Sequence, residues 1–142
     1  MILALKTSDK ISELYLLSIN NENKESKDFT ILKEKKWQAE RELAKTLLNE
    51  IEQLLDGKSF KELKGLIVFS GAGSFTGLRI GITTMNSISY SEEIPIIGIS
   101  GENWLKDGIK KLMNGKNDKI VIPNYGAEPN ITKPKTTKKR TP

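Results

Sequence analysis

Cysteine and histidine are both absent from this chain of 142 residues. Without cysteine there are no disulfides, and the expected compartment is the cytoplasm. Without either residue the chain lacks the usual ligands of a zinc site, and it has no histidine to act as a general base. No apolar run approaches membrane-spanning length, and Met1 leads directly into an apolar segment rather than a signal peptide. These absences leave a soluble, cytoplasmic, single-domain protein as the expectation.

Acidic residues are also missing from the end of the chain. The sequence has 23 Lys and Arg against 18 Asp and Glu, which gives a net charge of +5. Residues 130–142 hold five of the cations and no acid, so 18 basic and 18 acidic residues remain in 1–129. We therefore divide the chain into a neutral folded domain over 1–128 and a basic, Pro/Lys/Thr-rich disordered tail over 129–142.

Hydrophobic periodicity predicts three strands first and then alternating helices and strands. The predicted strands cover residues 2–5, 14–19, 29–32, 66–69 and 95–99, and the predicted helices cover 36–56, 76–91 and 102–113. Residues 119–123 are predicted to form a short last strand. The order βββαβαβα is typical of an α/β protein with a mixed sheet covered by helices.

The first predicted helix carries one broad apolar stripe, with Trp37 at its edge. The stripe consists of Leu43, Ala44, Leu47, Leu48, Ile51, Leu54 and Leu55. Packing of the helix on the sheet accounts for this stripe. At about 100° per residue, Glu40 projects into the middle of the stripe. A carboxylate in that position needs a partner, an interface or solvent.

The predicted strand of 66–69 is followed by a glycine-rich turn, whose glycines are Gly71, Gly73 and Gly77. Ser74 and Thr76 are suitable N-cap residues for the next helix, which is expected to begin near Leu78. A strand, a glycine-rich turn and a helix start can cradle an anion, but the same pattern also makes a tight connection without a ligand. The spacing is neither that of a P-loop nor that of the dinucleotide fingerprint. On the residues alone, the two interpretations carry about equal weight.

Residues 71–81, Gly-Ala-Gly-Ser-Phe-Thr-Gly-Leu-Arg-Ile-Gly, resemble the Gly-Pro-Gly-Ser-Phe-Thr-Gly-Leu-Arg-Ile-Gly signature of the TsaB (YeaZ) family. The opening Met-Ile-Leu-Ala-Leu-Lys-Thr-Ser is similar to the family's Ile-Leu-Ala-Ile-Asp-Thr-Ser, and Ile-Pro-Ile-Ile-Gly-Ile-Ser from Ile94 onward also matches. The resemblance runs in order through the first three quarters of the chain, to about residue 105. Three positions depart from the family pattern: Ala72 replaces proline, Lys6 replaces aspartate, and Glu40 stands where histidine is common.

This resemblance implies a ribonuclease H-like lobe of the actin-like ATPase (ASKHA) fold. Known relatives carry a second lobe of similar kind, so we expect this chain to represent the N-terminal lobe only. The predicted order of strands and helices agrees with that expectation.

The resemblance also implies a function. TsaB is similar to a catalytically inactive copy of its partner TsaD, the enzyme that transfers a threonylcarbamoyl group to the tRNA adenosine next to the anticodon (the t6A modification). The chain is then expected to be a non-catalytic scaffold subunit that binds and supports TsaD, with the ATPase TsaE as a further partner. Contact with tRNA is expected indirectly, through the complex or the basic tail, and a homodimer is an alternative when TsaD is absent.

Two sets of site residues follow from the resemblance. The signature loop contains Gly71, Gly73, Ser74, Phe75, Thr76, Gly77 and Arg79. The expected TsaD interface lies on the first two helices and contains Trp37, Glu40, Leu43, Leu47, Leu78, Ile82 and Met85. We expect no catalytic residue and no metal site.

An independent actin-like ATPase or phosphotransferase is the alternative. Such an enzyme needs a carboxylate in the first hairpin to hold Mg²⁺ at the phosphates, but Lys6 stands there, and Asp9 lies in the turn beside Lys10. Peptidase activity, suggested by glycoprotease-like descriptions of TsaB relatives, is not expected, because the hydroxyls of Ser70, Ser74 and Thr76 have no histidine to activate them. A Ser–Lys dyad is the alternative that the sequence leaves open, although no serine and lysine here have its signature spacing. We therefore expect no cofactor, and we expect this chain alone to bind neither ATP nor Mg²⁺.

Overall fold

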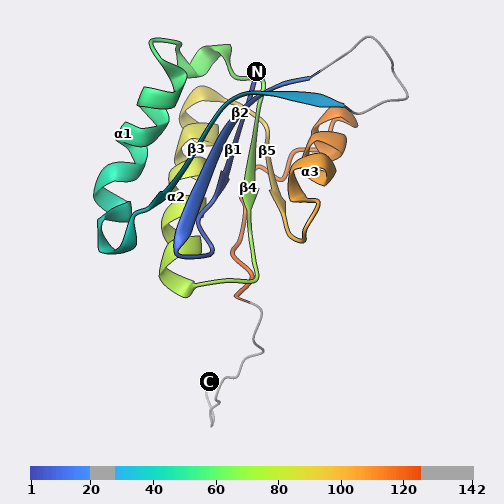
Figure 1. Cartoon of the computed structure of the whole chain (residues 1–142). Helices are drawn as coiled ribbons and strands as arrows, with labels where there is room; N and C mark the ends of the chain where they lie inside the picture. The colour runs from blue at the N-terminus through green and yellow to red at the C-terminus, as the bar shows by residue number, and fades with distance from the viewer. Residues whose placement is uncertain (20–27, 126–142) are drawn as a thin grey trace, which may run out of the picture.

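The computed structural model describes residues 1–19 and 28–125, except for the side chain of Glu40. Within these residues the chain forms a mixed sheet with helices on both faces (Figure 1). The strands are β1 (Ile2–Lys6), β2 (Ile11–Ile19), β3 (Phe29–Gln38), β4 (Gly65–Phe69) and β5 (Ile96–Ile99). The helices are α1 (Leu43–Leu55), α2 (Phe75–Glu92) and α3 (Trp104–Met113), with short 3₁₀ turns η1 (Glu40–Glu42) and η2 (Phe60–Glu62). The predicted tail over 129–142 lies outside the described residues.

The sheet has the order β3-β2-β1-β4-β5. β1 and β2 pair antiparallel, as do β2 and β3, whereas β4 runs parallel to β1 and β5 parallel to β4. Ala4, in the central strand, lies opposite Tyr15 on one side and Ile67 on the other. Three antiparallel strands followed by parallel strands joined through helices confirm the predicted mixed-sheet α/β class.

The two faces of the sheet are covered by different helices (Figure 1). Alternate residues of a strand point to opposite faces. On one face, Phe69 meets the ring of Trp104 edge to face and Ile67 packs under Gly108, so this face belongs to α3. On the other face, Thr7 packs against Gly81 of α2, and α1 packs beside α2. The end of β1 is therefore covered by the start of α2, where the signature loop lies.

β3 extends much further than predicted and includes Trp37, which the sequence analysis placed on the first helix. Trp37 lies opposite Ser12 in the sheet, and pairing with β2 continues to Gln38. Lys35, on the same face as Trp37, forms an ion pair with Glu50 of α1. Backbone pairing with β2 and the ion pair to α1 thus stabilise a strand whose sequence shows no apolar alternation beyond residue 32. The prediction that Trp37 belongs to a helical surface was wrong.

The first helix begins later than predicted, and the second begins earlier than residue 78. α1 starts at Leu43, after the 3₁₀ turn that contains Glu40. Its buried side chains are those of the predicted stripe, Leu43, Leu47, Ile51, Leu54 and Leu55. α2 begins at Phe75 rather than near residue 78, because Ser74 supplies the N-cap and accepts a hydrogen bond from the Gly77 N–H.

None of the helices within 1–19 and 28–125 has the length and apolar character needed to cross a membrane.

The predicted last strand over 119–123 is absent from the described sheet, which ends at β5. The side chains of Asn117 and Asp118 accept the N–H groups of Ile96 and Gly98, and so satisfy part of the β5 edge themselves. Val121 then bonds through its backbone to the side chain of Asn86 on α2, while its side chain packs against Gly98 of β5. The segment is therefore anchored by side chains, which explains why it does not continue the ladder.

Candidate functional site: the signature loop and the helix pair

The glycines of the signature loop lie where other parts of the same chain approach closely. A Cβ atom on Gly77 would stand 2.1 Å from the carbonyl oxygen of Thr7, and one on Gly73 would stand 2.4 Å from Cβ of Ser8. Gly71 has φ +141°, and its Cβ would fall 1.7 Å from the carbonyl oxygen of Asn124. Side chains at these positions would displace backbone, so internal packing accounts for the glycines.

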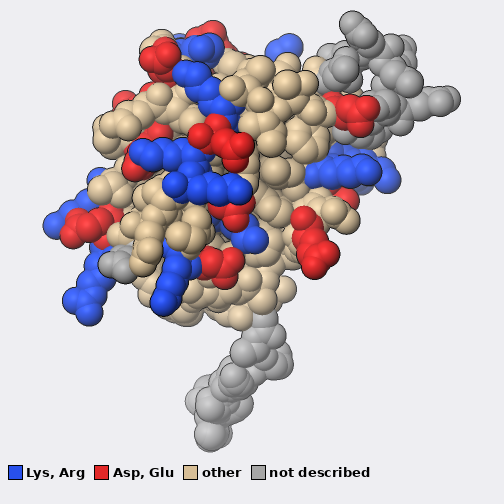
Figure 2. All heavy atoms as spheres, viewed as in Figure 1, with Lys and Arg blue, Asp and Glu red and all other residues tan. Residues whose placement is uncertain are grey.

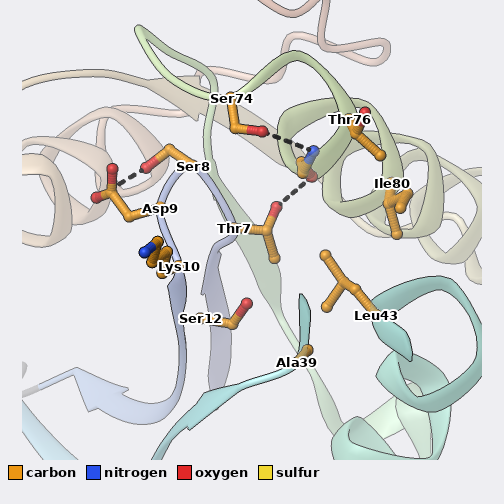
Figure 3. A pocket seen from close by; sticks show the side chains of 11 residues that line it. Thr7, Ser8, Asp9, Lys10, Ser12, Ala39, Leu43, Ser74, Thr76 and Ile80 are labelled. Atoms are coloured by element: carbon orange, nitrogen blue, oxygen red, sulfur yellow. Dashed lines mark hydrogen bonds between the residues drawn. The ribbon is translucent and has the colours of Figure 1, made fainter. Parts of the chain in front are cut away.

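Hydrogen bonds tie the loop to the same two segments. The N–H of Ser74 donates to the carbonyl of Ser8 at 2.9 Å. The hydroxyl of Thr7 donates to the carbonyl of Gly77 at 2.7 Å (Figure 3). On the other side, the N–H of Asn124 donates to the carbonyl of Ser70 at 2.6 Å. Of the two interpretations left open by the sequence, the tight connection explains the spacing of the glycines without a ligand.

A cleft of about 390 Å³ opens beside the loop (Figure 3). Its polar lining comes from the β1–β2 turn and from the start of α2, and its apolar lining from Ala39, Leu43 and Ile80. The charged groups at its edge are Asp9 and Lys10. Because the N-terminal end of α2 borders the cleft, a small anionic ligand would find a favourable dipole there.

Lys6 changes the chemistry of this region. Its ammonium group lies 4.6 Å from the centre of the Phe69 ring and 3.9 Å from a carboxylate oxygen of Asp9. Asp9, the carboxylate in the turn of the first hairpin, is therefore already paired with a cation. Within the described part of the chain, no group of three or more acidic residues could hold a metal ion. The expectation that the chain uses no cofactor stays a prediction.

A second hollow of about 340 Å³ lies between the outer surfaces of α1 and α2. Its lining residues are Ala44, Phe75, Thr76, Arg79, Ile80, Thr83 and Thr84. We call this hollow the helix-pair groove. Small and β-branched side chains line most of it, and Leu48, one helical turn beyond Ala44, is 50% exposed at its side.

Five of the residues predicted to contact a partner are buried within the chain itself. They are Leu43, Leu47, Leu78, Ile82 and Met85, and all belong to the core between the helices and the sheet. As an exposed contact surface, this apolar set was misplaced, because burying these side chains is what fixes α1 and α2 on the sheet. The exposed positions, Ala44, Leu48 and Thr83, lie on the adjoining faces of the same helices.

The remaining predicted residues are spread over several elements. Arg79 is exposed on α2 and its guanidinium lies 5.7 Å from the centre of the Phe75 ring. Trp37 is partly buried on β3, and its indole N–H has no hydrogen-bond partner. The backbone of Glu40 lies in η1. The structure thus brings Phe75, Thr76 and Arg79 together in the groove but leaves Trp37 apart from them.

Sequence reasoning missed Tyr125, whose ring stacks on Phe75 with centroids 4.5 Å apart. Tyr125 lies fifty residues further along the chain, between the predicted short strand over 119–123 and the predicted tail. Tyr125 reaches Phe75 because its neighbour Asn124 packs against Gly71. That contact forms only in the completed fold, so no local sequence pattern could have identified Tyr125.

Comparison with known proteins supports the family resemblance that the signature loop indicates. A family model described as TsaD, tRNA N6-adenosine threonylcarbamoyltransferase, matches residues 37–107, which is half of the chain. The protein named tRNA threonylcarbamoyladenosine biosynthesis protein TsaB from Escherichia coli is 31% identical over 81 residues, which cover 51% of this chain and 35% of that protein. The protein of the same name from Bacillus subtilis is 32% identical over 68 residues, which cover 47% of this chain and 27% of that protein.

A solved structure of YeaZ from Pseudomonas aeruginosa superposes with a TM-score of 0.56 at 25% identity, over 70% of this chain and 43% of that one. The fold is therefore ribonuclease H-like, as expected. The matched part spans 35% of the length of one curated relative and 27% of the other. The chain belongs to the family that the TsaD model describes and, within it, to the TsaB (YeaZ) proteins.

Proposed function

We propose that this chain acts in the cytoplasm in the biosynthesis of threonylcarbamoyladenosine in tRNA, as a non-catalytic subunit that binds and supports TsaD. The names of the curated relatives support the pathway, since both are called biosynthesis proteins of this modification. The observation that carries the proposal is that the TsaD family model matches the region containing α1, the signature loop and α2. TsaE would join the pair as a further partner.

Two features support the absence of catalysis by this chain. Lys6 occupies the position expected for a metal-binding carboxylate and pairs with Asp9. The glycines Gly73 and Gly71 of the signature loop are packed closely against the chain's own Ser8 and Asn124, so they do not need a ligand to explain them. A site for phosphoryl or acyl transfer needs a charge-stabilising group at the reacting atoms, and a lysine that already contacts a ring and a carboxylate is poorly placed for that role.

The helix-pair groove is the proposed contact with TsaD. Packed helices place the ridges of one surface into the grooves of another. The outer faces of α1 and α2 offer such a groove, with Ala44 and Thr83 as its small residues and Leu48 beside it as an exposed apolar residue. Arg79 and Phe75 stand at one end, and Arg and aromatic residues are enriched in interfaces.

Co-purification of this chain with TsaD from the same genome tests the proposal. The assay uses low and moderate salt and compares the wild type with Thr83→Arg and Leu48→Asp, which place a charge in or beside the groove. Ile122→Asp is the matched control, because Ile122 is also an exposed apolar residue but lies outside the groove. We expect a one-to-one complex that the groove variants weaken at least tenfold and the control leaves unchanged. A monomer or homodimer of the wild type at every salt concentration would refute the proposal.

Nucleotide binding is a second candidate, favoured by the cleft of about 390 Å³ beside the start of α2. A ligand that binds only the folded state raises the melting temperature. A thermal shift of several degrees with Mg²⁺–ATP would favour this alternative if Thr76→Asp, which adds a negative charge at the cleft, abolishes it and Thr30→Asp, at an exposed position outside the cleft, does not. No shift at millimolar nucleotide would leave the scaffold role as the better account.

A further inference from the structure

A pocket of about 360 Å³ lies at the edge of the sheet where the parallel strands β1, β4 and β5 begin. The signature loop follows the end of β4, at the opposite edge. Ile2, Lys64 and Pro95 line the pocket from the starts of the three strands, and Leu112 and Met113 line it from the end of α3. We call it the strand-start pocket. It shares no lining residue with the cleft beside the signature loop or with the helix-pair groove.

Most of the wall of this pocket is apolar. Ile2 is buried, whereas Leu112 and Met113 pack against the core and keep part of their side chains accessible. Pockets of 300–1,000 Å³ that combine apolar walls with a few polar groups are typical of small-ligand sites. At roughly 30 Å³ for a water-sized group, the pocket holds about ten non-hydrogen atoms. It can therefore accept a short aliphatic chain.

The charged side chains that line the pocket are both positive. They are Lys64 and Lys116, and neither forms an ion pair with a carboxylate of the described residues. Glu62, close to Lys64 in the chain, accepts the N–H of Ser59 instead. Over the face shown in Figure 2, by contrast, basic and acidic side chains are interspersed. An anion in the strand-start pocket would meet two cations that no acid of the described chain neutralises.

Asn117 adds a polar group whose orientation is fixed. Its side-chain oxygen accepts the N–H of Ile96 at 3.1 Å and the N–H of Lys119 at 2.9 Å. An amide oxygen that accepts two N–H groups leaves the NH₂ group of the same side chain as a donor. Among the described residues this NH₂ group has no acceptor. Asn117 also lines the pocket, so an anion bound there can accept its hydrogen bond.

The backbone at the pocket favours a carboxylate over a phosphate. The N–H of Lys64 donates to the carbonyl of Met1 at 2.7 Å. The N–H of Lys116 donates to the carbonyl of Lys111 at 3.0 Å. Phosphate sites commonly rely on several free backbone N–H groups, which these two residues do not offer. Two ammonium groups and one amide are a suitable set of donors for the two oxygens of a carboxylate.

We propose that the strand-start pocket binds a small aliphatic carboxylate. Its chain lies against the apolar wall and its carboxylate lies at Lys64, Lys116 and Asn117. Inorganic phosphate would use the cations without the apolar wall, and an aliphatic alcohol would use the wall without the cations. The site depends on the geometry of this pocket and not on the proposed function.

A ¹H–¹⁵N chemical-shift titration of the full chain with butanoate, hexanoate and octanoate tests this site. Acetate, hexanol and inorganic phosphate are the comparison ligands. One variant combines Lys64→Gln with Lys116→Gln, and Lys106→Gln is its control, because Lys106 is exposed on α3 outside the pocket. A second variant is Asn117→Asp, which keeps an oxygen to accept the two N–H groups but adds a negative charge. Asn49→Asp, at an exposed position of α1, is the control for that charge, and melting temperatures verify that each variant is folded.

We expect the amide signals of Lys64 and Lys116 to shift, and the affinity to rise at least about threefold for each two carbons added to the chain. Hexanoate should bind about tenfold more tightly than hexanol, acetate or phosphate. The double lysine variant should weaken hexanoate binding about tenfold and Asn117→Asp about fivefold, whereas each control should change it less than about twofold. Equal affinities for hexanoate and hexanol, or for hexanoate and acetate, would overturn the inference. So would shifts centred on the start of α2, or equal effects of the variants and their controls.

Carboxylate binding and the TsaD contact are measured separately, so they can fail separately. The titration uses this chain alone, whereas the TsaD contact is measured by co-purification. A chain that binds TsaD but shows none of the expected shifts keeps the scaffold function and refutes the carboxylate site. A chain that binds hexanoate as expected but not TsaD keeps the carboxylate site and refutes the scaffold function.

Discussion

Asn86 and Val121 are joined as two residues of neighbouring strands would be. The side-chain N–H of Asn86 donates to the carbonyl of Val121 at 3.0 Å, and the N–H of Val121 donates to the Asn86 side-chain oxygen at 2.9 Å. Together with the bond from the Asn124 N–H to the Ser70 carbonyl, this side chain holds the segment that brings Tyr125 onto Phe75. The position of Tyr125 thus depends in part on a residue in the middle of α2.

Replacement of Asn86 by Leu should loosen this segment. Both hydrogen bonds are lost and the backbone groups of Val121 are left without their partner, which costs about 1–3 kcal/mol of unfolding free energy. Urea denaturation measures the loss, and limited proteolysis should show faster cleavage within 117–125. Ser87→Ala is the control, because its hydroxyl bonds only to Thr83 in the same helix. Equal stability of Asn86→Leu and Ser87→Ala would contradict the assigned role.

Replacing Thr7 should reduce the cost of a side chain at Gly81 but not at Gly77, although both glycines lie in α2. A Cβ on Gly81 would meet the Thr7 hydroxyl oxygen at 2.2 Å, whereas a Cβ on Gly77 would meet the Thr7 backbone oxygen at 2.1 Å. Gly81→Ala and Gly77→Ala should therefore each destabilise the protein by about 1–3 kcal/mol. Thr7→Ala removes the first clash but not the second, so it should partly rescue Gly81→Ala alone.

Double-mutant cycles measure this difference through the free energy of unfolding. We expect a favourable coupling of at least about 0.5 kcal/mol between Thr7→Ala and Gly81→Ala, and none between Thr7→Ala and Gly77→Ala. Thr7→Ala alone also removes the hydrogen bond to Gly77, and the cycle subtracts that cost. Similar coupling in both cycles would show that the loop relaxes away from β1.

The capping box before β4 gives a local prediction. The Ser59 hydroxyl accepts the N–H of Lys61, and the Glu62 carboxylate accepts the N–H of Ser59 at 2.8 Å. Ser59→Ala should lower the unfolding free energy by about 1 kcal/mol. Lys61→Ala is the control, because only its backbone takes part. A loss in Lys61→Ala as large as that in Ser59→Ala would contradict a capping role.

The buried strands and the signature loop could be predicted from the sequence because their signals are local. Leu66 to Phe69 is a continuous apolar run, and glycines follow it directly. The later part of β3 carries no such signal, since its Lys33 and Lys35 find their ion-pair partners, Asp56 and Glu50, on a later element of the chain. The length of β3 is therefore set by long-range pairing with β2 and α1, which a local sequence pattern does not reveal.

The sequence located the helices of the candidate site correctly but did not show which of their residues are buried and which are exposed. Helical periodicity located the apolar residues of α1 and α2 correctly, yet a core face and a contact face are both partly apolar. Met85 was therefore predicted to be a contact residue, although it is fully buried. The stack of Phe75 on Tyr125 needs Asn124 to pack against Gly71, which depends on the completed fold.

Tyr15 should make part of the stability depend on alkaline pH. Burial raises the pKa of its phenol above the ordinary value, and its hydrogen bond to Glu13 raises the pKa further. The folded state therefore holds the phenolic proton more tightly than the unfolded state. This contribution to stability is fully present below pH 10, near the pKa of an unfolded tyrosine, and declines as the pH rises further.

Tyr15→Phe removes the titrating group while keeping the ring that faces Trp104. The variant should lose less unfolding free energy than the wild type between pH 9 and about pH 11, because its ring cannot release a proton. Chemical denaturation at the two pH values measures the difference, and Tyr90→Phe at an exposed position is the control. If Tyr15→Phe and Tyr90→Phe lose the same free energy over this range, the phenol of Tyr15 does not hold its proton in the way that its burial and its bond to Glu13 require.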